Sequence, residues 1–243
     1  MEVVMKITSL DNKKVKEVVK LQNKRYRDEK NLFIIETPNL IDEAYSLGVL
    51  KEIYKLEDYD LSLDVPTYDV TESVMNKIKQ VKTSKVLGIA YKKNSNEIIG
   101  NRILLLDGVS DPGNLGTIIR SAVGFNVDTI VLSRNSIDLY NDKVIRASEG
   151  AIFKINIIRE DLVKVIELLN SKNIPIYKTD VNKGDLVSNI KNDKYAVIIG
   201  SEGNGISHEV SGLVENSIHI KTNNIESLNV AIATSIILYE LDK

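Results

Sequence analysis

The sequence predicts an α/β protein of two domains, each built on its own sheet. Short apolar runs alternate with segments of helical periodicity, and the alternation restarts at Arg102, which is typical of α/β folds. The later runs are apolar without interruption, which favours a mostly parallel sheet covered on both faces. Because residues 92–101 are polar and turn-rich, we expect a domain over 1–95, a linker over 96–101 and a second domain over 102–243.

The first domain is expected to begin with a helix over residues 9–23. Val15 and Val18 recur there at helical spacing, and Asp11 can cap the start. Pro38 suits the first turn of another helix, which ends at Gly48. The remaining expected elements are strands at 32–36, 49–54, 65–68 and 86–91 and a helix that opens at Thr71.

The second domain is expected to repeat the order strand, turn, helix. Its predicted strands lie at 103–109, 129–133, 153–158, 174–179, 195–201 and 217–220. Its predicted helices lie at 115–125, 141–149, 160–172, 205–213 and 227–241.

Composition excludes several classes of chemistry. The chain has 243 residues and no cysteine, so disulfides, thiolate catalysis and cysteine-based zinc sites are excluded. Its two histidines, His208 and His219, are not spaced as a metal pair, and we expect no metal. No apolar run reaches the roughly 18 residues that cross a membrane, and the start of the chain lacks the apolar centre of a signal peptide. We therefore expect no membrane partner and a cytoplasmic location.

A net charge of −2 does not by itself indicate a nucleic-acid partner. The segment from Lys13 to Lys30 is nevertheless basic, with eight lysines and arginines against three acidic residues. Two interpretations remain open, a solvated amphipathic helix and a surface that binds phosphates.

Three segments of the second domain place glycine and small polar residues directly after an apolar strand. In the first, LDGVSDPGNLGTIIRSAVG, Asn114 is the expected N-cap of a helix with Leu115, Ile118, Ile119 and Ala122 on its buried side. Arg120 falls on the other side of that helix, near the sheet edge where open α/β folds bind ligands.

The second segment, VIIGSEGNGIS, contains Gly200, Gly203 and Gly205 around Glu202. Glycines allow close backbone approach and positive φ angles, so backbone groups are available there for an adenine or a ribose. The segment fits neither the phosphate-loop pattern nor the dinucleotide fingerprint.

The third segment, IKTNNIESLNVAIATSIILY, delivers an apolar helix that is expected to begin near Leu228, with Ser227 or Asn224 as its cap. A buried C-terminal helix explains its apolar residues. It does not explain the polar group Glu226, Ser227 and Asn229.

Together, the motifs DPGNLGTIIRSA, IIGSEGNGIS and IESLNVAIATSIILYE resemble the three signature motifs of the SpoU (TrmH-type) RNA ribose methyltransferases of the SPOUT superfamily, in the family's order. KVIRASEGAIFKI resembles the family's connecting segment. KNLFIIETPNLIDEAYSLGV and VKTSKVLGIAY resemble the ribosomal-protein-like RNA-binding domain that many members carry. The third motif departs from the family in lacking its usual Pro-Met and Gly.

The resemblance implies a trefoil-knot domain that binds S-adenosylmethionine, works as a homodimer and borrows residues across the dimer interface. The implied reaction transfers a methyl group to a ribose 2′-hydroxyl of RNA. The appended RNA-binding domain favours large-subunit ribosomal RNA over tRNA as the substrate. A tRNA ribose methyltransferase and a non-catalytic RNA-binding member of the fold are the alternatives.

Carried onto this sequence, the resemblance also implies the site residues. Arg120 matches the family's catalytic arginine, either as general base or, as we prefer for a group that keeps its proton, as the stabiliser of the developing alkoxide. The other catalytic candidates are Asn114, Glu202, Ser227 and Asn229. The cofactor-binding candidates are Gly200, Ser201, Gly203, Ile220, Leu228 and Asn229.

Overall fold

The computed structural model describes residues 5–93, 95–225 and 227–243. The chain divides into two compact units, one of residues 1–93 with 140–153 and one of residues 94–139 with 154–243. No feature of the sequence indicated that residues 140–153 would pack with the N-terminal unit.

The N-terminal unit is built on a five-stranded mixed sheet in the order β1-β4-β3-β5-β2. Its strands are β1 (Met5–Ile7), β2 (Leu32–Ile35), β3 (Leu50–Leu56), β4 (Thr67–Val70) and β5 (Val86–Tyr91). Its helices are α1 (Lys13–Lys20), α2 (Lys24–Lys30), α3 (Pro38–Ser46), α4 (Glu72–Ile78) and α6 (Asp142–Ala147), with a 3-10 turn at Ala151–Phe153. Helices α1 and α4 share one core cluster with the sheet.

The expected helix over residues 9–23 is shorter than predicted, Lys13–Lys20, and a second helix follows it at Lys24–Lys30. Asn12 caps α1 by accepting from the Lys14 amide, and Asn23 caps α2 by accepting from the Arg25 amide. Asp11 is therefore not the cap, and its carboxylate pairs with Lys16 instead. An asparagine side chain inside the expected helix competes for backbone amides, and that competition starts a new helix at Lys24.

The segment 140–153 is held to the N-terminal sheet by aromatic contacts. The ring of Phe33 in β2 lies 4.7 Å from that of Tyr140 and 6.0 Å from that of Phe153. The ammonium group of Lys92 lies over the Tyr140 ring at 4.7 Å. These rings form a small cluster that neither stretch of sequence could bury alone.

The second unit confirms the predicted parallel sheet. It has seven strands in the order β10-β12-β9-β11-β6-β7-β8, and every neighbouring pair is parallel. The strands are β6 (Arg102–Asp107), β7 (Thr129–Leu132), β8 (Asn156–Arg159), β9 (Ile176–Thr179), β10 (Asp185–Leu186), β11 (Tyr195–Gly200) and β12 (Ser217–His219). The helices are α5 (Pro112–Gly124), α7 (Leu162–Ser171), α8 (His208–Gly212) and α9 (Val230–Leu241), with a 3-10 turn at Val187–Asn189.

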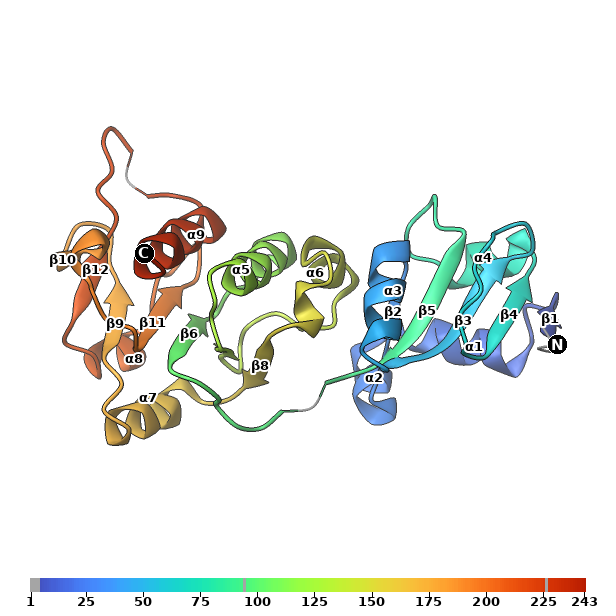
Figure 1. Ribbon diagram of the computed structural model, residues 1–243, viewed down its shortest axis with the longest axis horizontal. Helices are drawn as coiled ribbons and strands as arrows, with labels where there is room; N and C mark the ends of the chain where they lie inside the picture. Colours follow the sequence, from blue (N-terminus) through green and yellow to red (C-terminus); the bar gives the residue numbers. More distant parts are fainter. Residues whose placement is uncertain (1–4, 94, 226) are drawn as a thin grey trace. The chain divides into compact units, whose positions relative to one another are not determined.

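Helices cover this sheet on both faces, as uninterrupted apolar strands require. Helices α5 and α9 lie side by side on one face, and α7 and α8 cover the other (Figure 1). The predicted buried stripe of α5 is confirmed, because Leu115, Ile118, Ile119 and Ala122 are all fully buried. The guanidinium of Arg102 in β6 holds the C-terminal end of α9 through the Asp242 carboxylate at 2.5 Å.

Two further predicted helix caps are wrong, and both of these errors concern the site. Helix α5 begins at Pro112, and its cap is Asp111, whose carboxylate accepts from the Asn114 amide at 2.7 Å. Because proline favours the first helical position, the helix starts closer to the N-terminus than predicted. The Asn114 side chain is then free to make other contacts. Helix α9 begins at Val230, and its cap is Asn229 rather than Ser227 or Asn224.

None of the helices in the described ranges has the length and apolar character that a membrane-spanning segment needs.

Candidate active site

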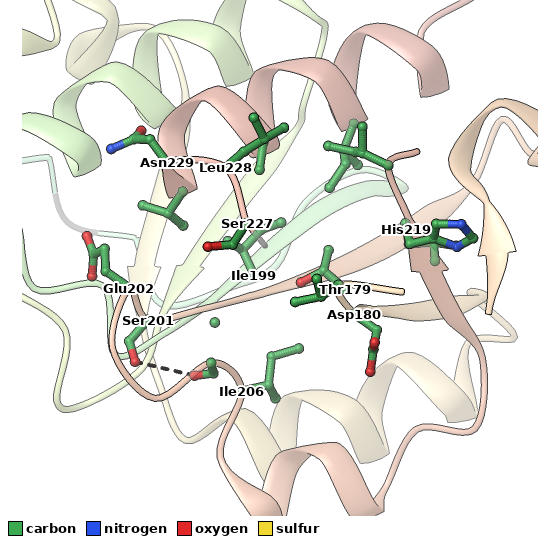
Figure 2. A pocket seen from close by; sticks show the side chains of 18 of the residues that line it. Thr179, Asp180, Ile199, Ser201, Glu202, Ile206, His219, Ser227, Leu228 and Asn229 are labelled. Atoms are coloured by element: carbon green, nitrogen blue, oxygen red, sulfur yellow. Dashed lines mark hydrogen bonds between the residues drawn. The ribbon is translucent and has the colours of Figure 1, made fainter. Parts of the chain in front are cut away.

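A cavity of about 540 Å³ opens where β9, β11 and β12 end and α9 begins (Figure 2). This is the carboxyl edge of a parallel sheet, where the loops after neighbouring strands converge. Apolar side chains such as Ile199, Leu228 and Ile237 share its wall with polar ones such as Thr179 and Ser227. The cavity is lined by residues 179–181, 199–202, 205, 206, 218–220, 222, 227–230, 233 and 237.

The wall at the end of β11 depends on one glycine. A β-carbon built on Gly200 would lie 2.2 Å from the carbonyl carbon of Gly205 and 2.3 Å from the Ile206 nitrogen. Both are backbone atoms, so no side-chain rotation relieves the contact. The backbone at Gly205 and Ile206 lies against Gly200 because Ser201 and Gly205 exchange two backbone hydrogen bonds of 3.0 Å. Gly205 has a φ of +65° in this tight turn.

The same loop is anchored to the neighbouring strand. The Ser207 amide donates to the carboxylate of Asp107, the last residue of β6, at 2.8 Å. Asp107 is only 6% exposed, and a buried carboxylate needs such a partner. The first and second motifs are thereby joined at their strand ends.

Asn114, Glu202 and Asn229 form a connected cluster that joins all three motifs. The Asn114 side-chain nitrogen donates to Glu202 Oε1 at 2.8 Å, and the Asn229 side-chain nitrogen donates to Asn114 Oδ1 at 3.1 Å. The Asn229 oxygen in turn accepts from the amides of Ala231 and Ile232 at the start of α9. The side-chain amides of Asn114 and Asn229 each donate through the nitrogen and accept through the oxygen. These bonds fix the orientation of both asparagines and of Glu202.

The predicted site residues fall into two groups. Gly200, Ser201, Glu202, Ile220, Ser227, Leu228 and Asn229 line the cavity. Figure 2 shows Glu202 and Asn229 on one side of it and His219 on the opposite side. Asn114 reaches the rim through Glu202, whereas Gly203 and Arg120 are exposed and do not line the cavity. Glu226 lies outside the described residues.

Sequence reasoning missed four polar residues of the cavity wall, namely Thr179, Asp180, His219 and Thr222. Thr179 and Asp180 follow the apolar run of β9 just as Ser201 follows that of β11, so the strand-end rule could have identified them. His219 ends β12 and carried no signal. Its Nδ1 is buried, and among the described residues it has no hydrogen-bond partner.

Within residues 5–93, 95–225 and 227–243, no group of three or more His, Asp or Glu side chains is arranged to hold a metal ion.

Comparison with known proteins places this site in a family. The SpoU rRNA methylase family matches residues 101–239, and an MRM3-like substrate binding domain matches residues 12–99. The chain belongs to the SpoU rRNA methylase family, which confirms the resemblance of its three motifs.

Relatives match along nearly the whole chain. The 23S rRNA (guanosine(2553)-2′-O)-methyltransferase RlmP of Bacillus subtilis is 30% identical and covers 97% of this chain and 98% of its own length. A solved rRNA methyltransferase from Sinorhizobium meliloti with bound S-adenosylmethionine is 28% identical with a TM-score of 0.85, covering 98% of this chain and 97% of the other. Both domains are therefore shared with these proteins, in the same order.

Proposed function

We propose that this protein transfers a methyl group from S-adenosylmethionine to a ribose 2′-hydroxyl of large-subunit ribosomal RNA. The observation that carries the proposal is the cavity at the strand ends, bordered by the Asn114, Glu202 and Asn229 cluster. The full-length match to a relative named as a 23S rRNA 2′-O-methyltransferase supports the RNA class. We retain residues 1–95 as the proposed RNA-binding domain and 102–243 as the methyltransferase domain, and the cytoplasm, where such RNA is found in bacteria, as the expected location.

The cavity fits S-adenosylmethionine. Its volume of about 540 Å³ lies within the range of small-molecule sites. The unpartnered Nδ1 of His219 and the backbone around Gly200 supply polar groups between apolar walls. We assign Gly200, Ser201, Ile220 and Leu228 to holding the cofactor, with Gly203 acting through its backbone. The cofactor supplies an activated methyl group on a sulfonium centre.

The catalytic assignments follow from charge and position. Glu202 and Asn229 are fixed by Asn114 at the rim, where they can orient an incoming ribose by hydrogen bonds. As the hydroxyl proton is lost to water and the 2′-oxygen forms its bond to the methyl carbon, the sulfur–methyl bond breaks, and a protonated guanidinium stabilises the negative charge that develops on the 2′-oxygen. We assign this role to Arg120 and assign Ser227 to contact with the substrate or cofactor.

We propose that the protein is a homodimer whose interface includes α9. This helix is mostly apolar, with only Thr234, Ser235, Tyr239 and Glu240 carrying polar side-chain groups, yet Ile232 and Tyr239 are 53% and 51% exposed. A helix that is apolar all round is normally buried. Arg120 lies on the adjacent helix α5, next to Ser121, whose hydroxyl is 2.7 Å from that of Ser235 in α9. A second copy seated on α9 would therefore also meet the surface that carries Arg120.

The RNA-binding surface is assigned to α1 and α2. Lys16, Lys24 and Lys30 are paired with acidic neighbours. Lys13, Lys20 and Arg25 are exposed and, in the described part of the chain, form no ion pair. We therefore interpret the paired lysines as a solvated helix surface and propose phosphate binding for the other three residues. Replacing these three residues with Ala should reduce the slope of log RNA affinity against log salt concentration by about two to three units.

The direct test uses purified protein, labelled S-adenosylmethionine and three RNA substrates. Large-subunit ribosomal RNA should accept label at a ribose that mass spectrometry locates, whereas small-subunit RNA and tRNA should not. Label in tRNA alone would replace the proposed substrate by the tRNA alternative. Cofactor binding without transfer to any RNA would favour the non-catalytic alternative, and absence of cofactor binding would refute the proposal.

A further inference from the structure

The loop of residues 133–137, which follows β7, lies beside the loop of the first motif. The Ser133 amide donates to the Leu106 carbonyl at 3.0 Å, and the Ile137 amide donates to the Val109 carbonyl at 3.0 Å. In return, the Gly108 amide donates to the Ser133 hydroxyl at 2.8 Å. Ser133 is nearly buried at 6% exposure. The two loops therefore form one hydrogen-bonded unit at the carboxyl edge of the sheet.

Arg159, the last residue of β8, holds this loop from the other side. Its guanidinium donates to the carbonyls of Ser133, Arg134 and Ser136 at 2.7, 3.3 and 2.8 Å, and to that of Ile137 at 2.5 Å. Four carbonyls that converge on one point repel one another unless a cation faces them. A planar guanidinium can face several at once, which a lysine ammonium cannot do in the same geometry.

The loop fixes the orientation of one exposed side chain, that of Asn135. The Ser133 hydroxyl donates to the Asn135 side-chain oxygen at 2.6 Å, so the NH₂ end of the amide is set on the opposite side. That nitrogen would lie 3.1 Å from a β-carbon on Gly108, and the Ser201 β-carbon would lie 3.6 Å from the same point. Asn135 thus lies next to Gly108 on the side of the second-motif loop, close to the cavity rim.

We propose that Asn135 is an RNA-binding residue of the methyl-acceptor side of the site, and that Arg159 is the positioning residue that holds it there. This rests on the proposed function, because the acceptor must approach the strand-end edge. An amide nitrogen at this edge donates to an oxygen acceptor of the RNA strand, the contact type that fixes the register of a nucleic acid. Arg159 touches neither cofactor nor RNA and acts through the loop.

The experiment compares Asn135→Ala, Arg159→Met, Arg159→Lys and the control Arg134→Ala in the full-length protein. Arg134 belongs to the same loop, but its exposed guanidinium pairs with Glu160 at 3.5 Å and donates to no carbonyl of the described residues. Asn135→Ala and Arg159→Met should each raise the KM for ribosomal RNA about fivefold to tenfold, as expected for one lost hydrogen bond to RNA. Arg159→Lys should lie between wild type and Arg159→Met, and Arg134→Ala should stay within about twofold.

Two further measurements separate positioning from general loss of structure. Arg159→Met should speed hydrogen exchange at the Gly108 and Ile137 amides while the Kd for S-adenosylmethionine stays within about twofold. The double variant of Asn135 and Arg159 should raise the RNA KM no more than the larger single change, because the two residues act in series.

Several results would overturn the inference. They are an unchanged KM in Asn135→Ala, an Arg159→Lys variant equal to wild type, an equal loss in Arg134→Ala, or a parallel loss of cofactor affinity. A wild-type protein that binds the cofactor but methylates no RNA would instead refute the proposed function, and the exchange measurement would still report whether Arg159 holds the loop.

Discussion

Replacing Gly200 with Ala tests whether the cavity depends on two backbones approaching each other closely. The added β-carbon would lie 2.2 Å from the carbonyl carbon of Gly205 and 2.3 Å from the Ile206 nitrogen, whereas ordinary contact begins at 3.4 Å. The two backbone segments must therefore separate by roughly 1 Å, because neither can rotate out of the way.

That separation has a predictable magnitude. Forcing extra volume into a packed site typically costs about 1–3 kcal/mol, and each kcal/mol lowers the Tm of a chain of this size by about 2–4 °C. Gly200, Gly205 and Ile206 all line the cavity, so their displacement also reshapes the cofactor site. We expect the affinity for S-adenosylmethionine to fall at least about tenfold.

Thermal unfolding and calorimetric titration with S-adenosylmethionine measure the two effects. The matched control is Gly203→Ala in the same loop, where a β-carbon would meet no atom within 4 Å. Because any Gly203 contact would come from its backbone, this variant should keep both the Tm and the affinity of wild type. Equal behaviour of the two variants would show that close approach at Gly200 is not what shapes the site.

Three other changes give separate tests. Arg120→Ala should lower the methylation rate at least about a hundredfold while cofactor affinity stays unchanged, since Arg120 does not line the cavity; a parent-like rate would refute its assignment. Ile232→Glu should shift the protein from dimer to monomer in sedimentation velocity, and a surviving dimer would exclude α9 from the interface. Burial raises the pKa of Tyr195 from 10.0 to about 12. The unfolded chain therefore loses the phenol proton at a lower pH than the folded protein, and the free energy of unfolding of wild type should fall between pH 10 and pH 12. In urea denaturation, this fall should be about 2–3 kcal/mol smaller in Tyr195→Phe than in wild type, and identical pH profiles would contradict the shift.

Those parts of the fold that depend on local sequence were predictable. The uninterrupted apolar runs predicted a parallel sheet, and Gly200, Gly203 and Gly205 predicted close backbone approach and a positive φ angle, which Gly205 has. The wrong cap of α5 was avoidable, because Pro112 marks the first helical turn and therefore points to Asp111. Strand β10, with two residues, is too short to show a period.

Features that depend on distant contacts were not predictable from residue patterns. Asn114 and Glu202 are 88 positions apart, and Asn114 and Asn229 are 115 positions apart, so no spacing rule places them together. Their grouping was expected only through the family resemblance. The packing of residues 140–153 on the N-terminal sheet depends on the match between Phe33 and two rings of that segment, and no local pattern encodes such a match.

The proposed homodimer would account for two features of the single chain. Arg120 is exposed and does not line the cavity it is proposed to serve, and the adjacent α9 leaves Ile232 and Tyr239 about half exposed. A second copy seated on α9 would cover these two side chains and bring its own Arg120 towards the cavity. Mixing Arg120→Ala with Gly200→Ala subunits tests this directly. If each site combines one copy's cavity with the other's arginine, mixed dimers contain one intact site, and random mixing restores about a quarter of wild-type activity. If Arg120 acts within its own copy, no mixture of the two variants can exceed the residual activity of either alone.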